Sequence, residues 1–377
     1  LKVVDKHADQ PRGKQDSQLR PSGCRYMRVT GIWQSVWLES VGMTYIQQFR
    51  LTSDMARKKV SIVLWTEGEM KGIQLEVRVL SNGAEFSKRS LEARRNQHSI
   101  RLPLTDLRAW SPECPNLYGI EFRLTRKGET VDEMHSYFGV RDISIKRNRI
   151  LLNGEPYFLK LALDQGYYLD GIYTAPSDLT IRKDVESVKK LGLNGVRKHQ
   201  QPPDPRYLYW ADVLGALVWE EMADWGMNLR RTNIACFLQE WETIINRDFN
   251  HPCVVAWVPF NERDPAESKE ARLFITAVYK KTKRLDPTRI VVDNSGYNHT
   301  ISDLTDIHDY TAWEGGHVFR QGWAKNKEER KGPYSPHQAL MSKGFRYKGQ
   351  PIVISEYGGW GMASYRPIVE RPRFSYG

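Results

Sequence analysis

The chain has 377 residues, of which 40% are hydrophobic and 27% charged, and it contains 12 Trp and 18 Tyr. This length provides for two or three domains, and this composition excludes a disordered chain and a small disulfide-bonded scaffold. The formal net charge is +11, but the basic residues occur in short scattered groups, so we expect solvated surfaces and no nucleic-acid partner.

Membrane and metal signals are weak along the whole chain. No stretch reaches the roughly 18 uninterrupted apolar residues that a membrane span needs, so we expect none. The first ten residues lack an apolar export signal and an initiating Met, which leaves the compartment open. The four cysteines are widely spaced and predict neither zinc binding nor a disulfide framework. They are Cys24, Cys114, Cys236 and Cys253.

The first 42 residues are polar and rich in Pro and Gly, with two short strand-like pieces at 25–30 and 32–38. We interpret them as the end of another domain, because they are too few to close one. From 43 to 140 the sequence alternates between apolar and polar residues in short runs separated by turn signals such as Asn82–Gly83. This spacing predicts an immunoglobulin-like β-sandwich.

From residue 141 to 377 buried strands alternate with helical patterns, which predicts a (β/α)₈-type TIM barrel and makes the fold class multidomain β and α/β. Helical spacing is found at 177–191, 237–249 and 266–285. Seven strand-like runs lie at 158–163, 193–196, 216–219, 253–258, 290–292, 303–310 and 352–354. An eighth strand has no sequence left to supply it, so we expect an incomplete barrel whose unclosed edges favour self-association.

Two of these strands end in a glutamate. The run 253–258 leads to Asn261–Glu262, and the run 352–354 leads to Glu356. The carboxyl ends of barrel strands meet at one face, so the two carboxyl groups could face each other. Such a pair cleaves glycosidic bonds, because one group protonates the leaving oxygen while the other attacks the anomeric carbon. The alternative is structural: Glu262 would begin a helix, and Glu356 would be an ordinary polar loop residue.

The sequence resembles glycoside hydrolase family 2, which includes β-galactosidases, β-glucuronidases and β-mannosidases. The segment from Arg247 to Pro252, continuing through Trp257 to Asn261–Glu262, resembles the family's acid/base signature, and 354–358 resembles its nucleophile strand. Further matches lie at 30–39, 138–141, 153–154 and 193–197. With this resemblance, residues 1–42 are expected to be the end of a jelly-roll sugar-binding domain, and the chain is expected to be truncated at both ends.

The resemblance also implies roles for individual residues. Glu262 would be the general acid/base and Glu356 the nucleophile. Arg197 would lie beside Glu356 and favour its ionised form, Asn261 would bind the sugar 2-hydroxyl, and Tyr310 would donate its hydroxyl to the nucleophile. For Arg197 a surface position stays open as an alternative, and for Tyr310 a position in the core.

Other polar residues at strand ends are candidates for sugar contacts only, namely Asp164, His199, Glu221 and His308. Four tryptophans could stack on sugar faces, although any one of them is more often a core residue than a stacking platform. They are Trp219, Trp225, Trp313 and Trp360. No cofactor is implied. Gly359 stands where some family members carry a histidine, which argues against a metal-assisted site.

We therefore expect a retaining, exo-acting β-glycoside hydrolase that acts through a covalent glycosyl-enzyme on a carbohydrate substrate. The alternative is a catalytically inactive fragment of such an enzyme, with at most weak carbohydrate binding. The distance between the Glu262 and Glu356 carboxyl groups is informative, since about 5 Å supports retention and roughly 6.5 to 9.5 Å supports inversion.

Overall fold

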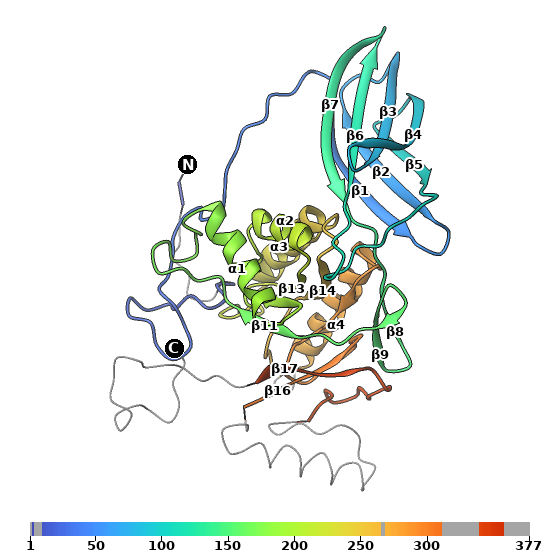
Figure 1. The fold of residues 1–377 in the computed structure, drawn as a ribbon. Helices are drawn as coiled ribbons and strands as arrows, with labels where there is room; N and C mark the ends of the chain where they lie inside the picture. Colours follow the sequence, from blue (N-terminus) through green and yellow to red (C-terminus); the bar gives the residue numbers. More distant parts are fainter. Residues whose placement is uncertain (1, 4–9, 265–267, 311–338, 358–377) are drawn as a thin grey trace.

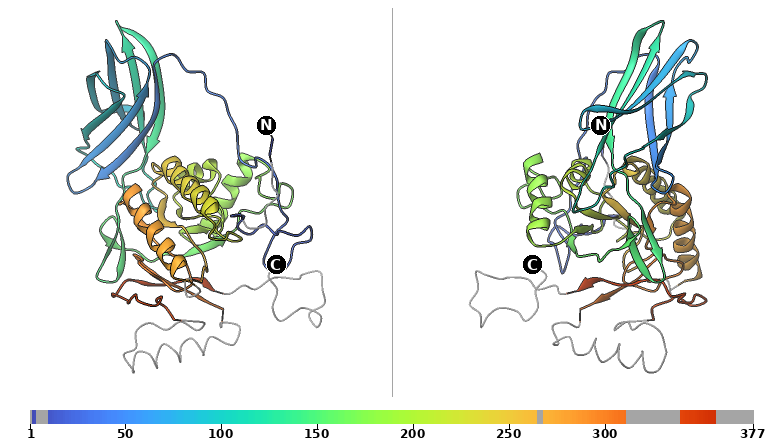
Figure 2. Two further views of the ribbon diagram at one scale, coloured as in Figure 1. Left: turned by 180° about the vertical axis from the view of Figure 1, so that it is seen from behind. Right: turned by 45° about the vertical axis from the view of Figure 1, so that its right-hand side comes forward.

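The computed structural model describes residues 2–3, 10–264, 268–310 and 339–357. A β-sandwich stands on top of a partial barrel, and the segment that precedes the sandwich lies along the outside of the barrel (Figure 1). The views in Figure 2 show the same arrangement from behind and from one side. The predicted fold class is confirmed. Among the described residues, no helix is both long and apolar enough to cross a bilayer.

The sandwich consists of two antiparallel sheets. One contains β1 (Tyr45–Asp54), β2 (Lys59–Glu67) and β5 (Gln97–Pro103), in that order. The other runs in the order β4 (Ala84–Ala93), β3 (Ile73–Ser81), β6 (Tyr118–Arg126) and β7 (Glu129–Phe138). Alternate residues of β3, from Ile73 to Val79, are fully buried between the sheets, as the period of a half-buried strand requires. Asn82 and Gly83 both have positive φ, the pattern of a type I′ hairpin turn.

A short antiparallel meander connects the sandwich to the barrel. It contains β8 (Ile143–Lys146), β9 (Arg149–Leu152) and β10 (Glu155–Pro156). Next to it, Arg141 donates from Nε to the carbonyl oxygen of Pro252 at 3.0 Å and from Nη2 to that of Val254 at 2.6 Å. The two domains are therefore joined by buried hydrogen bonds at the beginning of a barrel strand.

The barrel contains seven described strands, and each ends close to where the sequence predicts one. Five form a parallel sheet in chain order: β11 (Leu161–Asp164), β12 (Gly195–Lys198), β13 (Leu217–Glu221), β14 (Val254–Val258) and β15 (Ile290–Val291). β16 (Thr305–Asp309) pairs in parallel with β17 (Ile352–Tyr357). In the described part of the chain, β11 pairs only with β12, and β17 only with β16. These two strands border the unclosed side of the barrel.

Four helices pack on the outside of these strands, namely α1 (Asp178–Lys190), α2 (Pro205–Leu214), α3 (Arg231–Asp248) and α4 (Lys269–Leu285). Ser177 accepts a hydrogen bond from the backbone N–H of Thr180 and thereby caps α1, whose residues Ile181 and Val185 are buried. The sequence analysis did not find α2, which is short and begins at Pro205.

The predicted strands at 25–30 and 32–38 are wrong, because no described residue before Tyr45 belongs to a regular strand. Residues 10–34, here called the N-terminal strap, bond instead to loops at the carboxyl ends of the barrel strands. The Arg12 N–H donates to the Trp225 carbonyl at 3.0 Å, and Gln34 Nε2 donates to the Pro202 carbonyl at 3.2 Å. The strap's other hydrogen bonds include an isolated bridge between its own residues Gln15 and Tyr26, and none of the described strands pairs with it.

Candidate active site

The carboxyl ends of four barrel strands bring a buried group of charged side chains together. Arg197 comes from β12 and Glu221 from β13, Glu262 follows β14, and Glu356 lies on β17. Parallel strands present their carboxyl ends at one face, so side chains that are far apart in sequence meet there. Arg197, Glu221 and Glu356 are each at least nine-tenths buried.

Arg197 is the centre of this group. Its guanidinium lies 2.8 Å from Glu221 Oε2 and 2.9 Å from Glu356 Oε1, and Nη2 donates to Asn261 Oδ1 at 2.6 Å. Burial opposes its charge, but Glu221 and Glu356 outweigh burial and raise the pKa of Arg197 above its usual range. The surface position considered for Arg197 is therefore wrong.

Glu356 is held in its ionised form. Burial would raise the pKa of this carboxyl, but the electrostatic effects of the neighbouring His308 and Arg197 outweigh burial and place it well below its usual range. The Tyr310 hydroxyl donates to Oε2 of Glu356, which further favours the carboxylate. Between the pairs Ile307/Ile354 and His308/Glu356 the β16–β17 register shifts by one residue. Such irregularities redirect side chains beside active sites.

Glu262 has an unusual backbone. Its φ is 51°, in the left-handed region that residues other than glycine rarely adopt. The Glu262 N–H donates to the Ser295 carbonyl at 2.9 Å, which anchors this conformation. The next described helix, α4, has Ser268 as its N-cap, so Glu262 is not a residue of a helix's first turn. Strained backbone of this kind is concentrated at functional sites.

The two carboxyl groups lie close together. One oxygen of Glu262, one oxygen of Glu356 and one ring nitrogen of His308 all lie within 4.8 Å of one another. Glu262 is the more accessible of the two, since 23% of its side chain is exposed against 6% for Glu356. The pair therefore consists of one buried, ionised carboxylate and one carboxyl that reaches solvent.

Asn261 offers a hydrogen-bond donor that no described residue uses. Its Oδ1 accepts from Arg197, which orients the amide, while its Nδ2 is buried and has no partner among the described residues. A buried donor without a partner is costly unless a ligand satisfies it. The backbone on either side is fixed, because Asn261 N–H donates to Asp224 Oδ1 at 3.1 Å.

A cleft of about 670 Å³ opens beside Glu262 and Asn261. Trp225 and Tyr297 give this cleft aromatic walls, and Arg12 of the N-terminal strap lines it as well. Lys14 of the strap places its ammonium 4.0 Å from the centre of the Trp225 ring, a favourable cation–π distance. The strap therefore forms part of the boundary of the site.

Of the other predicted residues, His199, Glu221 and His308 belong to the buried group. His199 Nδ1 lies 3.0 Å from Glu221 and 3.8 Å from Glu356. Asp164 does not join them, because it pairs with Lys198 at 2.9 Å. The register of β11 and β12 places Asp164 and Lys198 side by side. The Asp164 carboxylate therefore forms an ion pair with the neighbouring strand and does not reach the buried group.

The predicted tryptophans have different locations. Trp219 is buried in the barrel core with 1% exposure, so it is not a stacking platform, whereas Trp225 borders the cleft. Trp313, Trp360 and Gly359 lie outside the described residues.

Sequence reasoning missed the residues that support the site from behind. Ser295 and Asp306 lie under it, where the Ser295 and Ser355 hydroxyls both donate to Asp306 Oδ2. Asp224 is buried, and burial raises its pKa to about 6 despite the nearby charge of Arg263. The polar run Asn294–Ser295–Gly296, which begins three positions after the end of β15, was the available signal.

Two groups of side chains in the described part of the chain have the spacing of a metal site. They are Asp212 with His251 and Cys253, and Glu262 with His308 and Glu356. In the first group Asp212 already receives His251 Nδ1 at 2.6 Å and the Tyr137 hydroxyl at 2.9 Å. In the second, the Arg197 guanidinium competes with any cation for Glu356. Hydrogen bonds and ion pairs thus account for both groups.

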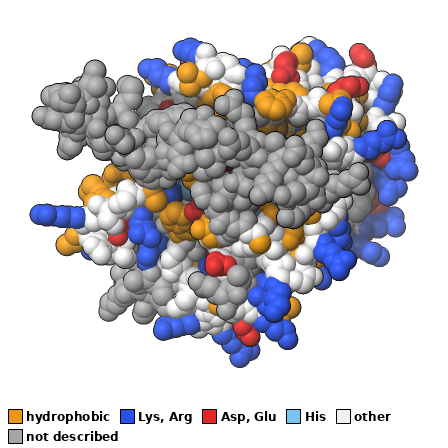
Figure 3. All heavy atoms as spheres, turned by 90° about the horizontal axis from the view of Figure 1, so that it is seen from below, with side chains coloured by type: hydrophobic (Ala, Val, Ile, Leu, Met, Phe, Trp, Pro, Cys, Tyr) orange, Lys and Arg blue, Asp and Glu red, His pale blue; other side chains and the backbone are white. Residues whose placement is uncertain are grey.

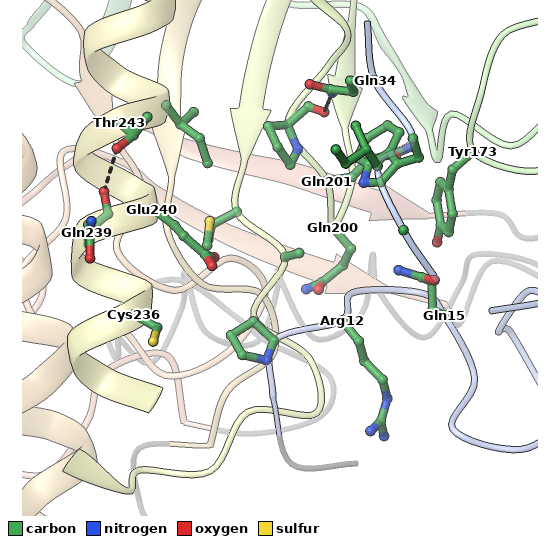
Figure 4. Close-up of a pocket in the computed structure, with 18 residues that line it drawn as sticks. Arg12, Gln15, Gln34, Tyr173, Gln200, Gln201, Cys236, Gln239, Glu240 and Thr243 are labelled. Atoms are coloured by element: carbon green, nitrogen blue, oxygen red, sulfur yellow. Dashed lines mark hydrogen bonds between the residues drawn. The ribbon is translucent and has the colours of Figure 1, made fainter. Parts of the chain in front are cut away.

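A second cavity, of about 640 Å³, lies between the N-terminal strap and α3 (Figure 4). Its labelled residues include Arg12 and Gln15 from the strap and Gln239 and Glu240 from α3. Burial raises the pKa of Glu240. On the face shown in Figure 3, the Lys and Arg side chains form several separate groups around the edge, which fits the scattered charge of the sequence.

A barrel with two acidic residues at its strand ends and a sandwich before it defines the class of multidomain glycoside hydrolases. The family model described as "Glycosyl hydrolases family 2, TIM barrel domain" matches residues 143–368, and that described as "Glycosyl hydrolases family 2" matches residues 44–141. The chain belongs to glycosyl hydrolases family 2, as its sequence predicted.

Curated relatives carry two kinds of name. A putative β-glucuronidase of Formosa agariphila is 24% identical over 87% of this chain and 40% of its own length. The β-glucuronidase of Rattus norvegicus is 27% identical over 78% of this chain and 47% of its own. A β-galactosidase of Thermoanaerobacter pseudethanolicus is 27% identical over 68% and 36% respectively. The chain thus spans less than half the length of these relatives.

Solved structures agree on the fold. The β-D-glucuronidase of Dictyoglomus thermophilum is similar to this chain with a TM-score of 0.70 at 20% identity, covering 88% of this chain and 57% of that one. A β-glucuronidase of Ruminococcus gnavus, solved with D-glucuronic acid, has a TM-score of 0.71 at 19% identity, covering 88% and 56%.

Proposed function

We propose that the protein is a retaining, exo-acting β-glycoside hydrolase. In this proposal Glu356 attacks the anomeric carbon, and Glu262 gives a proton to the departing oxygen and later takes one from water. The observation that carries the proposal is the approach of one oxygen of Glu262 and one oxygen of Glu356 to within 4.8 Å of each other. An inverting enzyme keeps its carboxyl groups roughly 6.5 to 9.5 Å apart to leave room for a water molecule.

The environments of the two residues support different roles. A nucleophile must be ionised, and Arg197 at 2.9 Å lowers the pKa of Glu356. An acid/base must reach both the substrate and water, and Glu262 lines the 670 Å³ cleft. Two carboxyl groups whose surroundings divide the roles in this way are the pattern of a glycosidase. The free Nδ2 of Asn261 is suited to a sugar hydroxyl.

The names of the relatives suggest the substrate class. β-Glucuronides and β-galactosides are the first candidates, because relatives carry the names β-glucuronidase and β-galactosidase. A panel of chromogenic β-glycosides that differ only in the sugar would identify the preferred one.

The test of the mechanism is Glu356→Ala. We expect turnover of the preferred chromogenic glycoside to be lost and then partly restored by azide, which replaces the missing carboxylate and yields the glycosyl azide. A 2-deoxy-2-fluoro glycoside should label the wild-type protein on the peptide that contains Glu356. Unchanged turnover in Glu356→Ala, or a label on a different residue, would refute the proposal.

A second candidate is a non-catalytic protein that binds sugar weakly. It is favoured by the unpaired outer edges of β11 and β17 in the described barrel. Under this alternative, calorimetry would detect binding of a monosaccharide, and the wild-type protein would turn over no glycoside of the panel.

A further inference from the structure

The ring of His308 lies between the two carboxyl groups of the site. Its Nδ1 is 2.7 Å from Glu262 Oε1, and its Nε2 is 3.4 Å from Glu356 Oε1. Only 3% of the side chain is exposed. The sequence analysis named His308 as a sugar contact, but these distances connect it to the acid/base.

Residues 295 and 296 pack closely against the His308 ring. Gly296 has a φ of 76°, and a Cβ atom added to it would lie only 2.3 Å from three atoms of the His308 imidazole ring. The Ser295 hydroxyl lies 3.4 Å from Nε2. Residues 295 and 296 follow β15, so the end of one strand shapes the seat for a side chain of the next. The packing of Gly296 and Ser295 therefore fixes the position of the His308 ring.

The neighbours of His308 assign its proton. Arg197 Nη1 lies 3.2 Å from Nε2, and an arginine can only donate. Nε2 is therefore the acceptor in the resting site, and the ring carries its hydrogen on Nδ1. That hydrogen points to Glu262 Oε1 at 2.7 Å. The hydrogen-bond network, rather than an observed hydrogen, supports this tautomer.

We infer that His308 is a positioning residue that strengthens Glu262 as the general acid. This inference rests on the proposed function. In the first half-reaction Glu262 transfers its proton to the glycosidic oxygen while the bond from that oxygen to the anomeric carbon breaks and the bond to Glu356 forms. Glu262 thereby becomes a carboxylate, and the Nδ1–H of His308 already donates to it.

The contribution grows as the reaction proceeds. A hydrogen bond to an ionised acceptor is roughly twice as strong as one to a neutral acceptor. The His308 bond is therefore stronger when Glu262 has lost its proton, and interactions that strengthen toward the transition state accelerate the step. Poor leaving groups need this proton most, so the contribution of His308 depends on the aglycone.

Two substitutions separate the two nitrogens. In His308→Asn the amide nitrogen can replace the Nδ1 donor, whereas in His308→Gln the amide can replace Nε2 beside Arg197 but leaves Glu262 without the donor. A third variant, Gly296→Ala, displaces the ring without changing its chemistry. Circular dichroism and urea unfolding of each variant report whether the fold is retained.

The readout is kcat/KM on two glycosides of the preferred sugar, one with a methyl aglycone and one with a 2,4-dinitrophenyl aglycone. For His308→Gln and Gly296→Ala we expect about a 10- to 100-fold loss on the methyl glycoside, the size of a lost hydrogen bond to a charged group. On the dinitrophenyl glycoside, which leaves without a proton, we expect less than about a threefold loss. His308→Asn, which keeps the Nδ1-like donor, should lose much less than His308→Gln on the methyl glycoside.

Other outcomes have distinct meanings. An equal loss on both aglycones in His308→Gln, or no loss on either, would overturn the role of His308 while Glu356→Ala still abolishes turnover. If Glu356→Ala leaves turnover unchanged, the proposed function itself fails.

Discussion

Arg197 Nη1 lies 2.9 Å from Oε1 of Glu356, and both side chains are buried. The same guanidinium also pairs with buried Glu221. One cation thus balances two buried carboxylates, so its removal would leave two charges without compensation.

Arg197→Ala should therefore lower the free energy of unfolding by about 3 to 5 kcal/mol, as for other buried ion pairs that lose one partner. The matched control is Arg182→Ala, which removes the exposed partner of Glu186 on α1 and should cost about 0.3 to 0.5 kcal/mol. Urea unfolding at neutral pH measures both. A cost for Arg197→Ala no larger than that of the control would contradict the central position of this residue.

Tyr310→Phe removes the hydroxyl that donates to Glu356. The hydroxyl helps to lower the pKa of Glu356, so its removal should raise that pKa and move the acid limb of the kcat/KM profile to higher pH. At neutral pH we expect a loss of about 10- to 100-fold. The control is Tyr279→Phe, whose hydroxyl bonds to Asp303 at 2.7 Å on the outer side of the barrel. An acid limb that stays in place would show that the hydroxyl does not act on the nucleophile.

Asn261→Ala removes the buried Nδ2 donor. On a glycoside with a 2-hydroxyl we expect kcat/KM to fall about 10²- to 10³-fold, as when one transition-state donor is lost. On the corresponding 2-deoxy glycoside the fall should be much smaller, because that substrate cannot accept the bond. Equal losses on the two substrates would mean that Asn261 acts only by holding Arg197.

His299 predicts how stability depends on pH. Burial opposes its charge, but Asp293 at 2.7 Å and Asp306 outweigh burial and raise its pKa from 6.5 to about 9. Because the folded pKa exceeds the unfolded one, the stabilisation is complete below about pH 6.5 and is lost as the pH rises toward 9. The total change is on the order of 3 kcal/mol.

The measurement is the free energy of unfolding between about pH 6 and about pH 10, a range that includes both the unfolded and the folded pKa of His299. His299→Gln should flatten the profile in this interval, while His135→Asn, at a position whose side chain is 57% exposed, should leave it unchanged. A wild-type profile that is flat from neutral to alkaline pH would show that His299 is neutral in the folded protein.

The sequence predicted the strands of the barrel well because each is a continuous apolar run that ends in polar residues. The run 253–258 corresponds to β14, which Glu262 follows by four residues, and Glu356 lies within β17, two residues past the predicted run. Periodicity could not show the tightly fitted seat formed by Gly296, because its meaning depends on the His308 ring of another strand. A single glycine in a polar run has no such signature.

Two other features could not be decided, or were predicted wrongly, for identifiable reasons. Trp219 lies in a strand that is buried on both faces, and an aromatic residue in such a strand has the same pattern whether it faces the core or the mouth. The N-terminal strap contains strand-forming residues, but it bonds to loops that are distant in sequence. In the strap, strand propensity gives way to tertiary contacts.

The hydrogen bonds from Arg141 to the carbonyls of Pro252 and Val254 have a practical consequence for anyone who would shorten the protein. Those carbonyls lie at the beginning of β14, and Glu262 follows the other end of that strand. A piece cut free of the sandwich and of Arg141 would leave the buried Pro252 carbonyl without this donor, and the Val254 carbonyl would keep only the bond from Arg289 Nε at 2.7 Å. Shortened versions of the protein should therefore keep the linker around residue 141, whatever else is removed.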